Sequence, residues 1–439
     1  MKFWSKGLIF SAAVMMMIGA LVSIGFATSQ TTPAPRVAVA SAIAHRTDKV
    51  APGTAIPVIP HAAAALFGQQ SAAAAASTPI ARAAQGTQTS EQVFKNIQVL
   101  KGIRVDEFMG TMGVFTTSLS LCCGNCHTGA GTEDPKWEDD PPRKKTARAM
   151  VTMVNDLNQK NFNGRQVVTC WTCHRGQLSP SVTPPLDFAY GEAVVVLPDQ
   201  LPRDTSGRAT TVDQIFAKYV QALGGQARVD ALTSYNANGT SILYGEVGKG
   251  DPAEIHAKTA GNQLSEIVHV AEGTVFRVFD GTTGWWQLPL TITPTYPLNG
   301  TLLEGAKIDA AMAFPWRIRQ VLPNYNWRLS YPSVIDGTEV EVIAGNTPPQ
   351  GAAAPGNLVT LYFDKNTGLL KRSIRYASTM VGRIPTQIDY ADYRPVAGVQ
   401  MPFKFSYAWV SQREEWTLTG YTPNPPAMAA SLFAKPTVN

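Results

Sequence analysis

The sequence has no long run of basic residues, and only 16% of its residues are charged. A formal net charge of +5 is small for 439 residues, so the charge pattern gives no indication of nucleic-acid binding. From residue 208 onward the sequence also has no nucleophile elbow, no phosphate-binding loop and no repeated acidic pair. The region from residue 208 therefore contains no catalytic motif that would identify a substrate.

Charge is absent altogether between Gly7 and Phe26, directly after Lys2 and Lys6. Small residues follow from Ala27, and this order is typical of a bacterial export signal. We therefore expect residues 1–30 to be either a signal peptide cleaved after Ala27 or an uncleaved membrane anchor, because about 20 apolar residues can span a bilayer. No cysteine ends the apolar run, which argues against a lipid-modified N-terminus. The expected location is the periplasm or the periplasmic face of the inner membrane.

Aromatic residues are nearly absent from residues 31–86, which are rich in Ala, Pro, Ser and Thr. Such a composition cannot bury enough apolar surface to fold, so it predicts a flexible linker. A proline-rich stretch at residues 186–207 predicts a second linker. Two folded domains are expected, at residues 87–185 and 208–439.

Cysteine is scarce, with five residues in the whole chain. Cysteines of an exported protein usually form disulfides. Here, however, four of the five lie in two C-x-x-C-H units, within SLCCGNCHTG and VVTCWTCHRG. This spacing is the mark of covalent c-type haem attachment, in which each thiol bonds a vinyl group and the histidine binds the iron. The residues concerned are Cys123, Cys126, His127, Cys170, Cys173 and His174. The sequence thus predicts two covalently bound haem c groups; a zinc site or disulfides are the alternative.

The fifth cysteine, Cys122, has no assigned role. A free thiol and an intermolecular disulfide are both open, and packing beside the haem as a small hydrophobic residue is the interpretation we favour.

An electron-transferring haem needs a second axial ligand, and methionine is a common one because its thioether favours ferrous iron. Upstream of the first motif, VDEFMGTMGVF carries Met109 and Met112 on a helical stripe. Gly110 and Gly113 interrupt that helix, and we expect them to let a flat macrocycle approach the backbone. Ordinary core packing is the alternative role of each methionine.

Upstream of the second motif, KKTARAMVTMVNDLNQ carries Met150 and Met153 on another predicted helix. Thr146 is the expected N-cap of this helix. Each unit therefore has the order helix, loop, haem motif. The repetition favours one methionine of each pair as an iron ligand.

The stretch from Lys101 to Gly176 resembles the tetrahaem cytochrome subunit of purple-bacterial photosynthetic reaction centres, most closely in TARAMVTMVNDLN and VTCWTCHRG. The resemblance implies a dihaem electron carrier, with Met109 and Met150 as axial ligands and Met112 and Met153 as fallbacks. There are departures from the family: two C-x-x-C-H motifs stand here instead of four, and KNFNGRQ lacks the histidine that serves a distant haem. The resemblance covers about 90 of the 439 residues.

The C-terminal region differs in kind. TVDQIFAKYVQALGG predicts a helix that ends at Gly224 and Gly225. Later segments such as LVTLYFDKNTGLLKRSIRY are β-rich, and FDGTTG and DKNTG predict hairpin turns. We expect an antiparallel twisted sheet or half-barrel, loosely similar to periplasmic lipoprotein carriers that enclose an apolar cavity. Trp285, Trp286 and Trp316 are expected in the core or along a cavity. Ordinary core or surface roles are expected for His256 and His269.

The predicted fold class is an α+β multidomain protein, with a small helical dihaem cytochrome domain before a β-rich domain. We expect an electron carrier rather than an enzyme. Its partners would be a redox donor and acceptor, with a photosynthetic reaction centre or another membrane complex as candidates, and the N-terminus would allow membrane association. Two alternatives remain: a redox enzyme whose haems serve an active site in the β domain, and a periplasmic carrier of an apolar ligand.

Overall fold

The computed structural model describes residues 88–436, apart from residues 133, 181–182, 184–200, 245, 290, 349–355 and 411. The predicted signal or anchor, the linker at residues 31–86 and most of the second linker lie outside these residues. No helix within the described ranges is long and apolar enough to cross a membrane.

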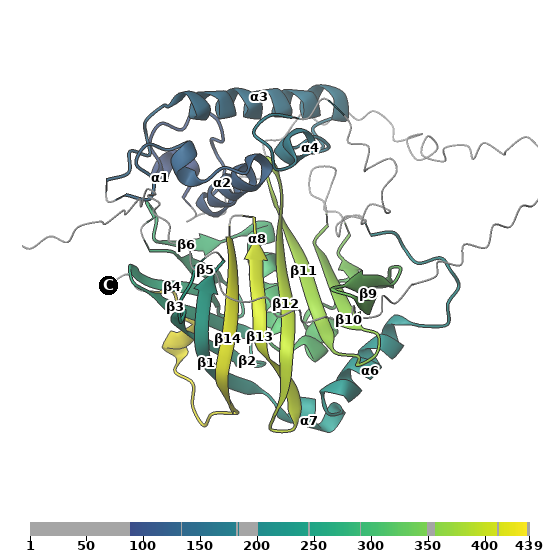
Figure 1. Cartoon of the computed structure of the whole chain (residues 1–439). Coiled ribbons are helices and arrows are strands. Elements are labelled where there is room, and N and C mark those ends of the chain that lie inside the picture. Colours follow the sequence, from purple (N-terminus) through teal and green to yellow (C-terminus); the bar gives the residue numbers. More distant parts are fainter. Residues whose placement is uncertain are drawn as a thin grey trace, which may run out of the picture. The chain divides into compact units, whose positions relative to one another are not determined.

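Helices and turns make up the N-terminal part of the described chain. They are α1 (Ser90–Val93), α2 (Val105–Leu119), η1 (Cys123–Asn125), α3 (Pro142–Phe162) and α4 (Cys170–His174). Helix α3 is the long helix at the top of Figure 1. The Met109 stripe thus forms the expected helix, α2. The expected start of α3 at Thr146 is wrong, because Pro142 occupies the first helical position and its fixed φ suits a helix start. Thr146 Oγ1 instead donates back to the carbonyl of Pro142 at 3.1 Å.

A large antiparallel sheet follows, and its strand order is β6-β5-β4-β3-β2-β1-β14-β13-β12-β11-β10-β9-β7, with β8 beside β9. Its first strands are β1 (Ser234–Leu243), β2 (Asp251–Lys258), β3 (Gln263–Val270), β4 (Gly273–Phe279), β5 (Gly284–Gln287), β6 (Thr295–Leu298) and β7 (Asn326–Leu329). The others are β8 (Ser333–Ile335), β9 (Thr338–Asn346), β10 (Leu358–Asp364), β11 (Leu370–Thr379), β12 (Gly382–Val396), β13 (Val399–Trp409) and β14 (Gln412–Pro423). Because β14 pairs with β1, the C-terminal strands close onto the first strand of the sheet.

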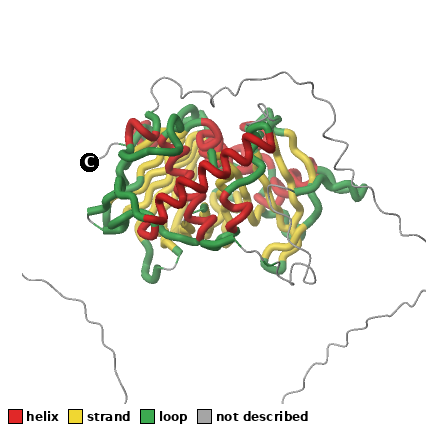
Figure 2. Tube along the Cα trace, turned by 90° about the horizontal axis from the view of Figure 1, so that it is seen from above, coloured by secondary structure: helices red, strands yellow, loops and turns green. Residues whose placement is uncertain are grey.

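The helices of this region are α6 (Val212–Leu223), α7 (Gln226–Ala231), α8 (Gly300–Met312), η2 (Pro315–Arg317), α9 (Ile318–Val321) and η3 (Ala430–Phe433). Helix α8 contacts β3, β4 and β6 as well as β11, so strands from both halves of the sheet curve around it. Seen from above, helices cross in front of the strands of the sheet (Figure 2). The expected α+β class, with a helical region before a large antiparallel sheet, is confirmed.

The local signals in the β region are also confirmed. Helix α6 ends at Gly224, whose φ of 122° is a conformation that favours glycine. The predicted turns at FDGTTG and DKNTG join β4 to β5 and β10 to β11. In each turn an aspartate side chain, Asp280 or Asp364, accepts hydrogen bonds from two following backbone N–H groups.

The N-terminal helices and the sheet share one buried core, which includes Val105 and Val114 of α2 together with Val381, just before β12, and Ile384 of β12. Polar contacts accompany the packing. The backbone N–H of Asn299 donates to Asp106 at 2.6 Å, and Gln166 donates to the carbonyl of Thr379 at 2.8 Å. The helical segment therefore rests directly on the ends of β11 and β12.

Candidate haem-binding sites

The first C-x-x-C-H motif is folded into a single tight turn. Cys123–Asn125 forms the 3₁₀ helix η1, and the backbone N–H of His127 donates to the carbonyl of Cys123 at 2.9 Å. Asn125 holds the start of the turn, because its Oδ1 accepts from the backbone N–H of Cys122 at 2.8 Å. One turn therefore presents Cys123, Cys126 and His127 together.

The imidazole of His127 is half-buried and lies edge-on to Trp137, with ring centroids 5.3 Å apart. Its Nδ1 is buried and has no hydrogen-bond partner among the described residues. Burial lowers the pKa of His127, and the positive charges of Lys144 and Arg148 act in the same direction. The neutral ring that results is the form that binds a metal.

The second motif forms the short helix α4. Thr169 caps it, because Thr169 Oγ1 accepts from the backbone N–H of Thr172 and Thr172 Oγ1 accepts from that of Thr169. His174 Nδ1 lies 3.0 Å from the carbonyl oxygen of Gln177, a contact in which the ring N–H donates. This bond fixes the tautomer in which Nε2 carries the lone pair. Haem-ligating histidines need that tautomer.

All five cysteines are free, and none of them forms a disulfide. Burial raises the pKa of the Cys126 and Cys170 thiols. Among the described residues no group of three or more His, Cys, Asp or Glu side chains could hold a metal ion. Cys122 is exposed, with its sulfur 3.1 Å from Asn125 Oδ1, so it does not pack into the described core.

Helix α2 has two distinct faces. A Cβ on Gly110 would lie 2.6 Å from Ile384 Cδ1 of β12, and Val114 on the same face lies 3.2 Å from the Cβ position of Gly382. We expected Gly110 to let a haem approach the helix backbone, but this space is occupied by Ile384 of the sheet. Met109 and Met112 lie on the opposite face by helical periodicity, are partly buried and pack against the core. Both stay candidates for the first axial ligand.

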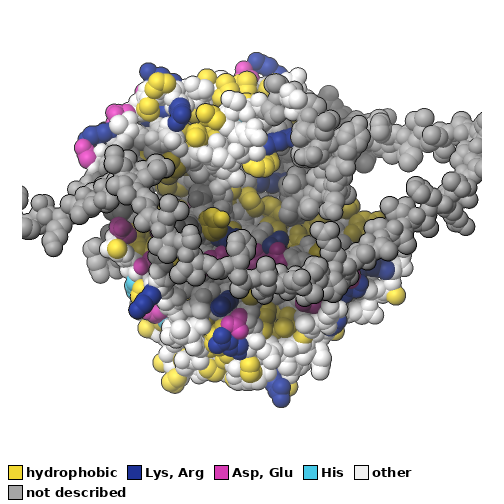
Figure 3. All heavy atoms as spheres, viewed as in Figure 1, with side chains coloured by type: hydrophobic (Ala, Val, Ile, Leu, Met, Phe, Trp, Pro, Cys, Tyr) yellow, Lys and Arg dark blue, Asp and Glu magenta, His cyan; other side chains and the backbone are white. Residues whose placement is uncertain are grey.

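Helix α3 likewise buries one face and exposes the other. Val151, Val154 and Asn158 are buried, whereas Met150 and Met153 are 36% and 43% exposed. Leu157 and Trp171, the latter 45% exposed, extend the apolar surface. Hydrophobic side chains gather on this end of the described chain in Figure 3. This exposed apolar surface lies beside the second haem motif, where a bound porphyrin would cover it.

The residues present fit two c-type haems. Each motif supplies two free thiols and a histidine from one turn, the tautomer of His174 is set for iron, and apolar surface lies beside the second motif. Within the described residues, no hydrogen bond or ring contact joins Met109 or Met150 to His127 or His174. Their assignment as ligands therefore remains a prediction.

One structural residue of this region was missed in the sequence. The buried amide of Asn158 donates to the carbonyl of Val168 at 2.7 Å and accepts from the backbone N–H groups of Val167 and Val168. It thereby fixes the segment that leads into the second motif. An Asn on the apolar face of a predicted helix was the only available signal.

A photosynthetic reaction centre cytochrome C subunit family model matches residues 44–187. The reaction center cytochrome c subunit of Roseobacter denitrificans is 31% identical over 122 residues, which are 25% of this chain and 33% of that protein. Its counterpart from Thermochromatium tepidum is 36% identical over 96 residues, 21% of this chain and 22% of that protein. The chain thus spans a third or less of the length of these relatives.

Among solved structures, a LolA superfamily protein from Nitrosomonas europaea aligns with 52% of this chain and 99% of its own, at 12% identity and a TM-score of 0.34. A lipoprotein-sorting protein domain from Vibrio parahaemolyticus covers 47% of this chain and 92% of its own, at 9% identity and a TM-score of 0.32. The resemblance to the reaction-centre cytochrome c subunit family is confirmed for residues 44–187, and both C-x-x-C-H motifs lie within that match.

Proposed function

We propose that this chain is an exported dihaem c-type cytochrome that transfers electrons. The observation that carries the proposal is the local fold of the two C-x-x-C-H motifs, each of which presents two free thiols and a histidine from one turn. Their position inside the segment that matches the cytochrome family supports it.

The residues have separate roles in this proposal. Cys123 and Cys126 would hold the first haem through thioether bonds, and Cys170 and Cys173 the second. A bound haem supplies an iron that cycles between the ferrous and ferric states. The chain fixes the ring orientation of its ligand through the His174 Nδ1 contact with Gln177, and keeps His127 neutral by burial.

The partners would be a redox donor and a redox acceptor on the periplasmic side. A photosynthetic reaction centre is one candidate, because the relatives are named as its cytochrome subunits. The chain carries two attachment motifs, and its match covers only part of those relatives. We therefore propose a carrier of two haems rather than the four of the tetrahaem subunit. An electron-transfer role needs no catalytic group in the sheet region.

The haem load tests this function directly. We expect mass spectrometry of the denatured full chain to show two covalent haems. Cys123→Ala combined with Cys126→Ala should remove one of them, and Cys170→Ala combined with Cys173→Ala should remove the other. Cys122→Ala is the matched control and should keep both. Zinc without iron, or a haem load unchanged by the paired substitutions, would contradict the proposal.

A further inference from the structure

A cavity lies inside the curved sheet, between its concave face and the helices α6 and α8. Its volume is about 70 Å³. One water needs roughly 10–15 Å³ measured in this way, so the space suits a group of about five heavy atoms. Five tyrosines dominate its wall, Tyr219, Tyr235, Tyr390, Tyr393 and Tyr421, and Trp316 and Phe405 complete the aromatic lining.

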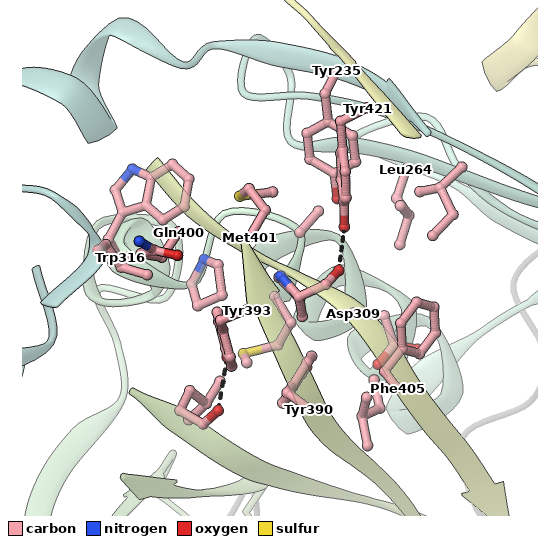
Figure 4. A pocket seen from close by; sticks show the side chains of 18 of the residues that line it. Tyr235, Leu264, Asp309, Trp316, Tyr390, Tyr393, Gln400, Met401, Phe405 and Tyr421 are labelled. Carbon is pink, nitrogen blue, oxygen red and sulfur yellow. Dashed lines mark hydrogen bonds between the residues drawn. The ribbon is translucent and has the colours of Figure 1, made fainter. Parts of the chain in front are cut away.

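Two of these tyrosines have unused hydroxyls. Tyr393 donates to the carbonyl of Leu370 and Tyr421 to that of Pro402, each at 2.7 Å, as the dashed lines in Figure 4 mark. In contrast, Tyr219 and Tyr235 are only 2% and 5% exposed, and their hydroxyls bond to no residue that the structure describes. The wall also holds Trp316, whose Nε1 is fully buried and has no hydrogen-bond partner among the described residues. Since buried polar atoms normally have a partner, these groups leave hydrogen bonds for a ligand or water in the cavity.

The wall also carries acidic groups. Glu266 and Asp309 line the cavity, whereas no Lys, Arg or His does so within the described part of the chain. Glu266 binds Arg277 at 2.8 Å, and Asp309 pairs with Arg375. Arg277 is shared with the buried Glu414, at 2.9 Å. The two groups meet at Tyr407, whose hydroxyl accepts from Arg375 at 3.1 Å and whose ring centroid lies 4.5 Å from the Arg277 guanidinium. The cluster therefore holds three carboxylates and two guanidinium groups.

This cluster has one negative charge more than its partners neutralise when all its members are ionised. Burying this excess charge is unfavourable, and burial accordingly raises the pKa of Glu266 despite the neighbouring Arg277. Burial also raises the pKa of all five tyrosines, so their hydroxyls stay neutral. Because no described Lys, Arg or His lines the cavity, an anionic ligand would face the carboxylates first, whereas a cation in the cavity would favour the ionised form of Glu266 and balance its charge.

We propose that this cavity binds an organic cation of the trimethylammonium class. Aromatic walls attract such ions through the negative faces of the rings, and aromatic cages are the usual sites of quaternary ammonium ligands. A trimethylammonium head has about the size of the cavity. A substituent such as a hydroxyl could take the hydrogen bonds that Tyr219 and Tyr235 leave unused. This ligand site is separate from the haem motifs and does not depend on the proposed electron transfer.

Three probes of equal shape and different charge test the site. Isothermal titration of the full chain would compare choline, its neutral isostere 3,3-dimethylbutan-1-ol and the anion 3,3-dimethylbutanoate. We expect choline to bind roughly tenfold more tightly than the alcohol, because the cation gains the attraction of the rings and the carboxylates. The anion should bind more weakly than both. Equal or tighter binding of the alcohol or the anion, or no binding of choline at millimolar concentration, would overturn the proposal.

A variant isolates the charge term. Glu266→Gln removes the excess negative charge, and we expect it to bring the choline-to-alcohol affinity ratio close to one. Glu415→Gln, a half-buried position on the same strand as Glu414 that pairs with Arg413 and does not line the cavity, should leave the ratio at the wild-type value. Both affinities are measured on the same protein, so a smaller folded fraction would lower them equally and leave their ratio unchanged. Circular dichroism of the variant and the wild type therefore checks that Glu266→Gln is folded before the two ratios are compared. An unchanged ratio in folded Glu266→Gln would contradict the charge argument.

Discussion

Single residues decide the redox properties proposed for the haems. The proposed axial methionine is the residue whose assignment can be tested most directly. Replacing Met150 by His should lower the potential of one haem and leave the other nearly unchanged, because a thioether stabilises ferrous iron more than imidazole does. A redox titration would measure both potentials, and the weak far-red sulfur-to-iron band should decrease by half.

Met153→Leu is the control for this prediction. Met153 lies one helical turn from Met150 on the exposed face of α3, so its loss should change packing and not ligation. If Met153→Leu shifted a potential while Met150→Leu did not, the choice within the pair would be wrong. The same comparison applies to Met109 and Met112 on α2.

Asn158 is a residue whose effect should appear in stability. Asn158→Ala leaves the backbone N–H groups of Val167 and Val168 without their acceptor, which should cost roughly 1–3 kcal/mol of unfolding free energy. Urea denaturation would measure the change. Asn161→Ala, an exposed position on the same helix, should stay within about 0.5 kcal/mol of the wild type. Equal effects of the two substitutions would show that Asn158 does not anchor this segment.

The two haem motifs could be predicted from the sequence because their chemistry is local: two thiols and a histidine lie within five residues. The roles of Asn158 and Trp137 could not be predicted, because their partners Val168 and His127 lie about ten residues away and come close only in the folded chain. The same holds for the cavity, whose tyrosines lie on α6, β1, β12 and β14. These elements are far apart in the sequence, and only the curvature of the sheet makes their tyrosines converge.

At the scale of elements, the contact between α2 and β12 depends on Gly110. Gly110→Ala should destabilise the protein by about 1 kcal/mol, because overpacking against Ile384 exceeds the gain in helix propensity. In an Ile384→Val background, which removes the clashing Cδ1, the same substitution should stabilise the protein. Denaturation of the four proteins of this double-mutant cycle gives the coupling, which we expect to be roughly 1–2 kcal/mol.

Ile388→Val provides the matched background for that cycle. Ile388 lies on the same strand but lines the cavity inside the sheet, so its coupling to Gly110→Ala should be near zero. Equal couplings to Ile384 and Ile388 would show that the effect does not arise at the contact. The sequence predicted the helix at α2 but placed a haem over Gly110, because the pattern of one helix does not show which element packs on each face.

At the scale of the whole described chain, the two regions that the sequence separates at residues 186–207 share one buried core. The helical segment is joined to the sheet by the Ile384 contact with α2 and by the hydrogen bonds of Asp106 and Gln166. Apolar burial across a boundary makes the two sides unfold together when its free energy exceeds the difference in their own stabilities.

We therefore expect a single cooperative transition in urea. The sulfur-to-iron band reports the haem segment and far-UV circular dichroism reports the sheet, and both should change at the same denaturant concentration. Ile384→Ala should remove roughly 2–5 kcal/mol of packing at the contact and bring the loss of the haem band to a lower urea concentration than the loss of the sheet. Ile335→Ala makes the same chemical change in a separate buried cluster of the sheet, so it should shift both transitions together. Two separate transitions already in the wild type would mean that residues 87–185 fold independently, as the sequence alone suggests, and that the shared core adds too little free energy to couple the haem segment to the sheet.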